Sequence, residues 1–287
     1  MRPRIVEALG AYLGSAADWV VPSPALVYAL AMVASLIVLR FRSRRAPGIE
    51  PYHALGITLW TMVGALVGAR GFYLVQHYQE ILADPVRMVA PGGATASWGA
   101  YLGGGAGLAA YCARHRLSGL RYADLVAPVV GLTMAVGRWA CFLNGDDFGT
   151  RTDVPWAVRF PHASYPFVDH VHAGLIKPLD AWSLPVHPVQ LYLSASGLAL
   201  FFAATWFWRR HRDRPGASLC FFWLLASITR FALEFFRGDH HHFVLGLPSS
   251  QFMALLTGVA AAAGLAWTMR RSSVSVLAEE RRLTAPS

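Results

Sequence analysis

The sequence predicts an all-α integral membrane protein with about seven transmembrane helices, and three observations point to that class. Of its 287 residues, 55% are hydrophobic and 14% are charged, whereas a soluble domain carries about 25% charged residues. Several apolar runs reach about 20 residues, the length that a helix needs to cross the hydrocarbon core. Basic residues gather in short clusters between alternate runs, as they do in the cytoplasmic loops of membrane proteins.

Seven runs are long and apolar enough to be candidate spans. Only helices fit them, because lipid cannot satisfy open backbone groups and the runs are too long and too uniformly apolar for barrel strands. The third run is short and rich in glycine, so its apolar signal is the weakest. The predicted spans are 24–40, 54–76, 97–113, 123–145, 188–208, 216–237 and 249–269.

Arginine clusters predict the direction in which the chain crosses the membrane. They follow the first, third, fifth and seventh spans, whereas the other connections carry fewer basic residues. The clustered residues are Arg40, Arg42, Arg44, Arg45, Arg114, Arg116, Arg121, Arg209, Arg210, Arg212, Arg214, Arg270, Arg271, Arg281 and Arg282. Because basic loops stay in the cytoplasm, we expect the N-terminus outside and the C-terminus inside.

The chain is expected to have three parts. Residues 1–22 are predicted to lie at the membrane interface; acidic residues and glycines interrupt their apolar run, which argues against a cleaved signal peptide. Residues 23–270 are expected to form the seven-helix domain, in which the proline-rich external connection 146–187 builds a small cap. Residues 271–287 are predicted to be a cytoplasmic tail.

Composition also argues against other classes of protein. The net charge is +9, but the arginines lie between apolar runs, which favours anchoring at a membrane over nucleic-acid binding. The three cysteines fall within apolar segments, so no disulfide framework is expected. The sequence lacks the spacings of His and Cys that are typical of zinc sites, and we predict neither a metal nor another cofactor.

Four arginines lie inside the predicted spans, all at the depth of the outer leaflet: Arg70, Arg138, Arg230 and Arg237. An intramembrane arginine costs at least ~2.5–3.5 kcal/mol on insertion scales, so each needs a partner or a polar cavity. Pairing with carboxylates or snorkelling to the surface would suffice. However, Glu234 is the only acid well inside a span, and one acid cannot neutralise three arginines. We therefore predict a phosphate site for a phospholipid head group.

Other polar, aromatic and small residues are expected at the same depth. Taken singly, the aromatic residues could be an interfacial belt and the glycines helix-packing contacts. Their shared depth with the arginines makes them candidates for the same site. They are Tyr28, Trp98, Gly99, Tyr101, Gly103, Gly104, Gly105, Asn144, Gly145, Asp146, Asp147, Gly149, His187, Gln190 and Tyr192.

Several motifs resemble one family. Residues 137–149 read GRWACFLNGDDFG, which is similar to the signature of bacterial prolipoprotein diacylglyceryl transferases, roughly GRxGNFxNGExxG. Residues 187–192 and 230–237 resemble the HPSQLYE and RxxxEFFR motifs of that family. Shorter matches are Tyr28, 68–70, 83–85 and 92–93, and the resemblance extends from about residue 24 to 270.

The resemblance implies transfer of a diacylglyceryl group from phosphatidylglycerol to the lipobox cysteine of a prolipoprotein, with release of glycerol phosphate. It also implies a bacterial inner membrane, with the site facing the periplasm. By this resemblance the catalytic residues are Arg138, Arg230, Asn144 and Tyr28. The residues expected to bind phospholipid are Arg70, Arg138, Arg230, Arg237, Gly145, Gly149, Trp98, His187, Gln190 and Glu234.

Some polar positions depart from the family pattern. Trp98, or Ser97 in a shifted alignment, stands where the family has the histidine proposed to activate the thiol. Other polar residues of the family are replaced by Cys141, Asp146, Leu193 and Ala226. These changes fit a divergent transferase, or a paralogue that moves a phospholipid-derived group onto another acceptor. A lipid-binding or transport protein without chemistry is the third hypothesis.

The sequence leaves the thiol-activating base open. Histidines of the external connection and of the run 240–242 have a pKa suited to proton transfer, although solvent-exposed loop histidines are commoner. Cys141 could act as a nucleophile, but a buried, unreactive thiol is the more ordinary interpretation.

Overall fold

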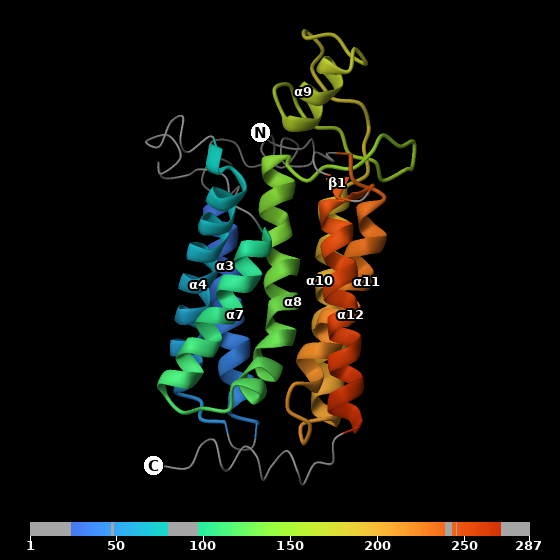
Figure 1. Cartoon of the computed structure of the whole chain (residues 1–287). Coiled ribbons are helices and arrows are strands. Elements are labelled where there is room, and N and C mark those ends of the chain that lie inside the picture. Colours follow the sequence, from blue (N-terminus) through green and yellow to red (C-terminus); the bar gives the residue numbers. More distant parts are fainter. Residues whose placement is uncertain (1–23, 47–48, 80–96, 239–242, 245, 271–287) are drawn as a thin grey trace. The chain divides into compact units, whose positions relative to one another are not determined.

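The computed structural model describes residues 24–46, 49–79, 97–238, 243–244 and 246–270. Within them lie seven helices of at least 18 residues (Figure 1): α3 (Pro24–Ser43), α4 (His53–Gln76), α7 (Ser97–Arg114), α8 (Gly119–Asn144), α10 (Val189–Arg210), α11 (Ala217–Glu234) and α12 (Ser249–Arg270). The predicted interfacial segment and cytoplasmic tail lie outside the described residues, so both stay predictions.

The helices match the predicted spans closely, and the prediction of an all-α membrane protein with about seven spans is confirmed. In the described part of the chain, six of the helices are long and apolar enough to cross a membrane. The seventh is α7, which has 18 residues and is rich in glycine. The weak apolar signal of the third predicted span is therefore explained by glycines that pack another helix, as shown below.

Some predicted boundaries differ from the structure by a few residues, and the end of the sixth span is one of them. The sixth span was expected to reach residue 237, but α11 ends at Glu234. The backbone of the next residues pairs with a distant segment instead: the amide of Thr150 donates to the carbonyl of Phe236 at 2.8 Å, and the amide of Gly238 donates to that of Phe148 at 3.1 Å. These bonds use backbone groups that would otherwise continue the helix, so Arg237 lies beyond its end.

The chain divides into two compact units. Of the described residues, unit 1 takes 24–35 and those of Ala127–Arg270, and unit 2 takes those of Leu36–Val126. Helices α3 and α8 therefore each contribute to both units.

The core of unit 1 lies between α8, α10 and α11. Its buried residues are Ala127, Leu200, Ala204, Phe222 and Ala226. The backbones of α8 and α10 approach closely where glycines face each other, because a Cβ on Gly131 would lie 2.9 Å from the carbonyl oxygen of Gly197. Small residues at such crossings are how membrane helices gain packing contacts.

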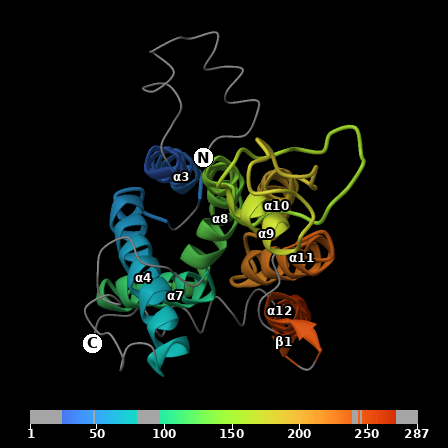
Figure 2. The same cartoon turned by 90° about the horizontal axis from the view of Figure 1, so that it is seen from above.

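In unit 2, α4 and α7 pack against each other (Figure 2). Glycines form a seam along their contact. We call it the glycine seam; its members are Gly64, Gly68, Gly99, Gly103 and Gly107. A Cβ on any of them would collide with the backbone of the facing helix. The seam brings the two backbones into direct contact, as small residues do in membrane helix pairs.

The connection 146–187 is folded, although it contains little regular structure. It includes the short helix α9 (Tyr165–His172), and its backbone forms isolated bridges such as Val158 to Val186. Phe160 and Val186 of this connection are buried against Phe142 of α8. Near the end of α11, two residue pairs form the strands β1 (Phe243–Val244) and β2 (Leu247–Pro248).

Candidate active site

The candidate site begins where α8 ends. After Asn144 the backbone of Gly145 turns into the left-handed region, with φ of 80°, and its amide donates to the carbonyl of Cys141 at 2.8 Å. This is a common way to close a helix, and glycine adopts it without steric cost. Asp147 also has a positive φ, of 54°, which is unusual for a residue with a side chain. The turn therefore holds Asp147 in a specific, constrained position.

Backbone hydrogen bonds join this turn to the start of α10 and the end of α11. The amide of Gly149 donates to the carbonyl of His187 at 3.1 Å, and Gly149 also pairs with Arg237 as an isolated bridge. A Cβ on Gly149 would overlap His187 and approach Val189 to 2.8 Å. Glycine is required here because three chain segments meet at one point.

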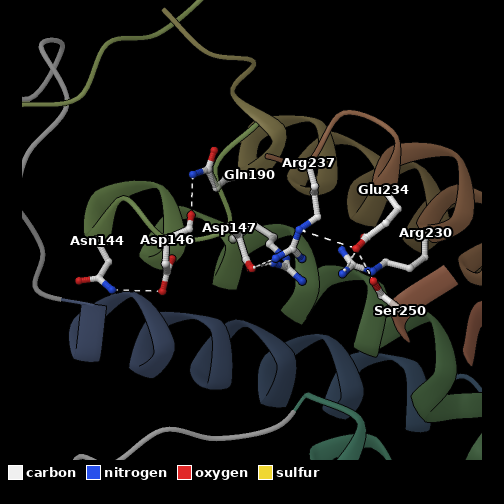
Figure 3. A network of polar contacts seen from close by, with 9 residues as sticks. Asn144, Asp146, Asp147, Gln190, Arg230, Glu234, Arg237 and Ser250 are labelled. Carbon is white, nitrogen blue, oxygen red and sulfur yellow. Dashed lines mark hydrogen bonds and ion pairs between the residues drawn. The ribbon is translucent and has the colours of Figure 1, made fainter. Parts of the chain in front are cut away.

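Five charged side chains meet at this point, and we call them the arginine junction: Arg138, Asp147, Arg230, Glu234 and Arg237. Arg138 of α8 donates to one carboxylate oxygen of Asp147, and Arg237 donates to the other at 2.6 Å. The Glu234 carboxylate lies 2.9 Å from Arg230 and 3.9 Å from Arg237. Figure 3 shows Glu234 between these two arginines and Asp147 at the other side of Arg237.

The side chains of the junction are mostly buried but keep some contact with solvent. The side chains of Arg138, Arg230 and Arg237 are 16%, 21% and 13% exposed, and that of Asp147 is 26% exposed. Partial burial strengthens charge interactions because the local dielectric is low. Two carboxylates contact three guanidinium groups, so the five side chains together carry one excess positive charge.

Arg230 also keeps an open donor. Its Nη1 is buried and makes no hydrogen bond to the described residues. An unsatisfied buried donor is costly, and such groups in native proteins commonly face a ligand or water. The other carboxylate oxygen of its partner Glu234 accepts a hydrogen bond from Ser250 of α12. The open Nη1 of Arg230 can therefore donate a hydrogen bond to an oxygen atom of an anion.

The charge state of Asp147 follows from its neighbours. Burial alone would raise the pKa of this carboxyl, but Arg138, Arg237 and Arg230 together hold the pKa below its ordinary value. Asp147 thus stays ionised at neutral pH. Burial instead raises the pKa of the adjacent Asp146.

A second polar group lies beside the junction. Gln190, fully buried on α10, donates to the backbone carbonyl of Asp146 at 2.6 Å, and Asn144 donates to the Asp146 carboxylate at 3.1 Å. The thiol of Cys141 lies next to this carboxylate, and the phenol of Tyr28 lies next to the thiol. The structure thus brings the predicted residues Tyr28, Asn144 and Gln190 to the same end of α8.

His187 contacts other residues of the protein near the junction. Its Nδ1 lies 3.1 Å from the hydroxyl of Tyr192, and its ring packs edge-on against Phe236. Its backbone carbonyl accepts the hydrogen bond from Gly149. The structure therefore supports a positioning role, and contact between its side chain and a lipid stays a prediction.

Two predicted site residues belong to unit 2. Arg70 lies on α4 with its guanidinium carbon 5.8 Å from the centre of the Tyr73 ring. Trp98, at the start of α7, packs edge-on against Tyr101. Their contact with phospholipid stays a prediction, and the histidines 240–242 lie outside the described residues.

Comparison with known proteins shows the family. The family model described as prolipoprotein diacylglyceryl transferase matches residues 18–267. The chain belongs to this family.

Named relatives agree with the family model. A phosphatidylglycerol–prolipoprotein diacylglyceryl transferase of Gloeobacter violaceus is 32% identical over 254 residues, which cover 86% of this chain and 89% of that protein. Enzymes of the same name from Methylococcus capsulatus and Clostridium tetani are 32% and 28% identical. These matches cover 74% and 80% of this chain, and 76% and 86% of the respective relatives.

Sequence reasoning missed two contacts of this transferase-family site. Asp147 was expected at the depth of the arginines, but only Glu234 was expected to pair with them, whereas Asp147 is a second carboxylate partner and Ser250 supports Glu234. The pairing was missed because only acids inside the spans were counted as partners. The acidic pair directly after α8 was the available signal, since residues that close a helix lie at the depth of its last turn.

Proposed function

We propose that this chain transfers the diacylglyceryl group of phosphatidylglycerol to the lipobox cysteine of a prolipoprotein and releases glycerol phosphate. The arginine junction is the observation that carries this proposal. It offers three guanidinium groups and only two carboxylates, with a buried donor of Arg230 still open. Relatives of the chain bear the name of this activity.

The junction supplies what the departing phosphate needs. In the reaction the sulfur–carbon bond forms while the bond between the glyceryl carbon and the phosphate oxygen breaks. The electron pair of that bond goes to the phosphate, and the proton lost by the thiol balances the new charge. Positive groups placed where charge develops stabilise the transition state, and losing one such donor typically costs about 10²–10³ in rate. Arg138 and Arg230 are the groups that we assign to this role.

The neighbouring polar residues orient the head group rather than attack it. The nucleophile belongs to the substrate protein, so no internal Ser–His or Cys–His pair is required. Asn144 and Gln190 are both tied to Asp146, which keeps their amides at the end of α8. Tyr28 of α3 approaches the last turns of α8, with its ring near Gly137 and its phenol beside the thiol of Cys141. We propose that these groups shape the site around glycerol.

We also propose that the site faces the periplasm from a bacterial inner membrane. Within unit 1 the junction lies at the start of α10, whereas Arg209 and Arg210 lie at its other end. The Arg210 guanidinium stacks 4.8 Å from the ring of Trp206, an arrangement suited to the membrane interface. Basic residues at that end favour the cytoplasmic side, which leaves the junction outside.

Two assays test the proposal. A bacterial strain depleted of its own transferase should regain growth when it expresses this chain, and purified protein should transfer diacylglyceryl from phosphatidylglycerol to a lipobox peptide. Arg138→Ala should abolish both effects, whereas Arg209→Ala is a matched control that removes an arginine from the far end of unit 1. Properly inserted protein that neither rescues growth nor modifies the peptide would exclude this function and favour a different acceptor.

A further inference from the structure

Asp147 forms an anion bridge between two elements of unit 1. One carboxylate oxygen accepts from Arg138 of α8, and the other accepts from Arg237, beyond the end of α11, at 2.6 Å. Two oxygens of a phosphate could make the same pair of contacts, because carboxylate and phosphate both accept parallel hydrogen bonds from guanidinium groups. The carboxylate thus occupies one nitrogen of each arginine, Nη1 of Arg138 and Nη2 of Arg237, which a phosphate bridging the two side chains would use.

The position of Asp147 is unusual in two respects. Its backbone φ of 54° is unfavourable for a residue with a Cβ. The side chain is also 26% exposed, more than the three arginines, so it lies at the accessible edge of the junction.

We propose that Asp147 is an internal competitor of the phosphate head group. In the lipid-free protein its carboxylate holds Arg138 and Arg237, and it must leave at least one of them when a head group binds. This inference rests on the proposed function for the nature of the head group. It identifies Asp147 as a residue that sets the affinity for substrate and product.

Competition by Asp147 should weaken the binding of the phosphate head group to the wild-type protein and speed the release of glycerol phosphate. When a protein must first leave a closed state, its apparent affinity falls by the fraction of molecules in the open state. When the Asp147 carboxylate returns to Arg138 and Arg237, it also favours departure of glycerol phosphate. The two anions compete for the same guanidinium nitrogens. Product release limits the rate of many enzymes, so this competition would raise turnover.

Binding of glycerol phosphate to the purified full-length protein tests the inference directly. Asp147→Asn keeps the shape of the side chain and removes its charge, and it should lower the Kd measured by calorimetry about tenfold, as expected if about one molecule in ten is open in the wild type. Asp153→Asn is the matched control, because it removes the same charge from an exposed position of the same connection. Unchanged or weaker binding by Asp147→Asn would overturn the inference.

A second variant guards against a folding defect. Asp147→Gly also removes the carboxylate, and glycine adopts a φ of 54° without strain. It should bind glycerol phosphate more tightly than the wild type. If both variants unfold at the temperature of the wild type and neither binds more tightly, Asp147 is only a scaffold for the arginines.

Kinetics separate this inference from the proposed function. With phosphatidylglycerol and a lipobox peptide, Asp147→Asn should lower both KM and kcat, whereas a scaffold role would raise KM. A wild type that transfers nothing, together with tighter glycerol phosphate binding by the variant, would reject the proposed function and keep the competition. A wild type that transfers, with KM equal or higher in the variant, would reject the competition and keep the function.

Discussion

The arginine junction of unit 1 and the glycine seam of unit 2 are held together by opposite kinds of contact, the first between charged side chains and the second between backbones. The junction collects charged side chains that would be costly apart, and it is stable because each guanidinium has a carboxylate partner. The seam has glycines at its contact points, so the helices meet through their backbones. A change in the junction should therefore alter chemistry while the fold persists, whereas a change in the seam should alter the fold first.

The largest effect is expected at Arg138. Arg138→Lys keeps the positive charge beside Asp147 but loses the planar, forked donor, so transfer should fall about 10²–10³-fold, as for loss of one transition-state donor. The unfolding temperature should stay near that of the wild type. Peptide modification and thermal unfolding, measured on one preparation, check both statements. A variant that is unstable instead of inactive would contradict the assignment of chemistry to the junction.

The next effect is expected at the seam. Gly103→Ala places a Cβ against the backbone of Gly64 and Gly68, and overpacking of this kind costs about 1–3 kcal/mol. Gly105→Ala is the matched control on the same helix, because a Cβ there has no neighbouring atom within 4 Å. The control should be neutral or slightly stabilised, since alanine is the better helix former. Equal losses of stability in both variants would refute the seam.

Ser250 should show a smaller effect that connects stability with chemistry. Ser250→Ala removes the hydroxyl that donates to Glu234, and one hydrogen bond contributes about 0.5–1.5 kcal/mol. We expect a modest loss of stability and a severalfold loss of transfer, because Glu234 holds Arg230. Ser249→Ala changes the neighbouring serine and serves as control. If transfer by Ser250→Ala equals that of the control, α12 does not support the site.

The smallest effect concerns pH and sharpens the contrast between the charged junction and residues 165–187 of the external connection. His170 on α9 is buried, and its Nδ1 accepts a hydrogen bond from the amide of Leu184 at 3.2 Å. Burial lowers the pKa of His170 below 6.5, with Asp169 opposing and Arg151 adding to the shift. His170 binds a proton more readily in the unfolded segment than in the folded one. The neutral His170 therefore stabilises the folded segment fully above pH 6.5, and this stabilisation is lost as the pH falls through the lowered pKa.

Hydrogen exchange, corrected for the intrinsic effect of pH, measures this difference. Peptides covering 165–187 should exchange faster below pH 6.5, while peptides covering 225–238 should not, because the pKa of Asp147 lies below its ordinary value and the junction stays charged. His170→Asn retains an acceptor for Leu184 and should abolish the pH response. His172→Asn, at an exposed position of the same helix, should leave it intact.

Local sequence patterns accounted for the features that depend on neighbours along the chain. The helices follow the apolar runs because each span must satisfy its backbone internally within the lipid. The pair of Arg230 and Glu234 was also visible, because residues four apart share one face of a helix. The same spacing rule could not reveal the seam, since it depends on which helix lies opposite the glycines.

The sequence by itself determined the membrane class, the approximate spans and the arginines that need an anion. Tertiary structure alone decided what faces those arginines. Arg237 and Asp147 are 90 residues apart, and they meet because the backbone after α11 pairs with the backbone after α8 and ends the helix at Glu234. Such long-range pairing has no local periodicity, so the carboxylate that bridges Arg138 and Arg237 appears only when the chain is folded.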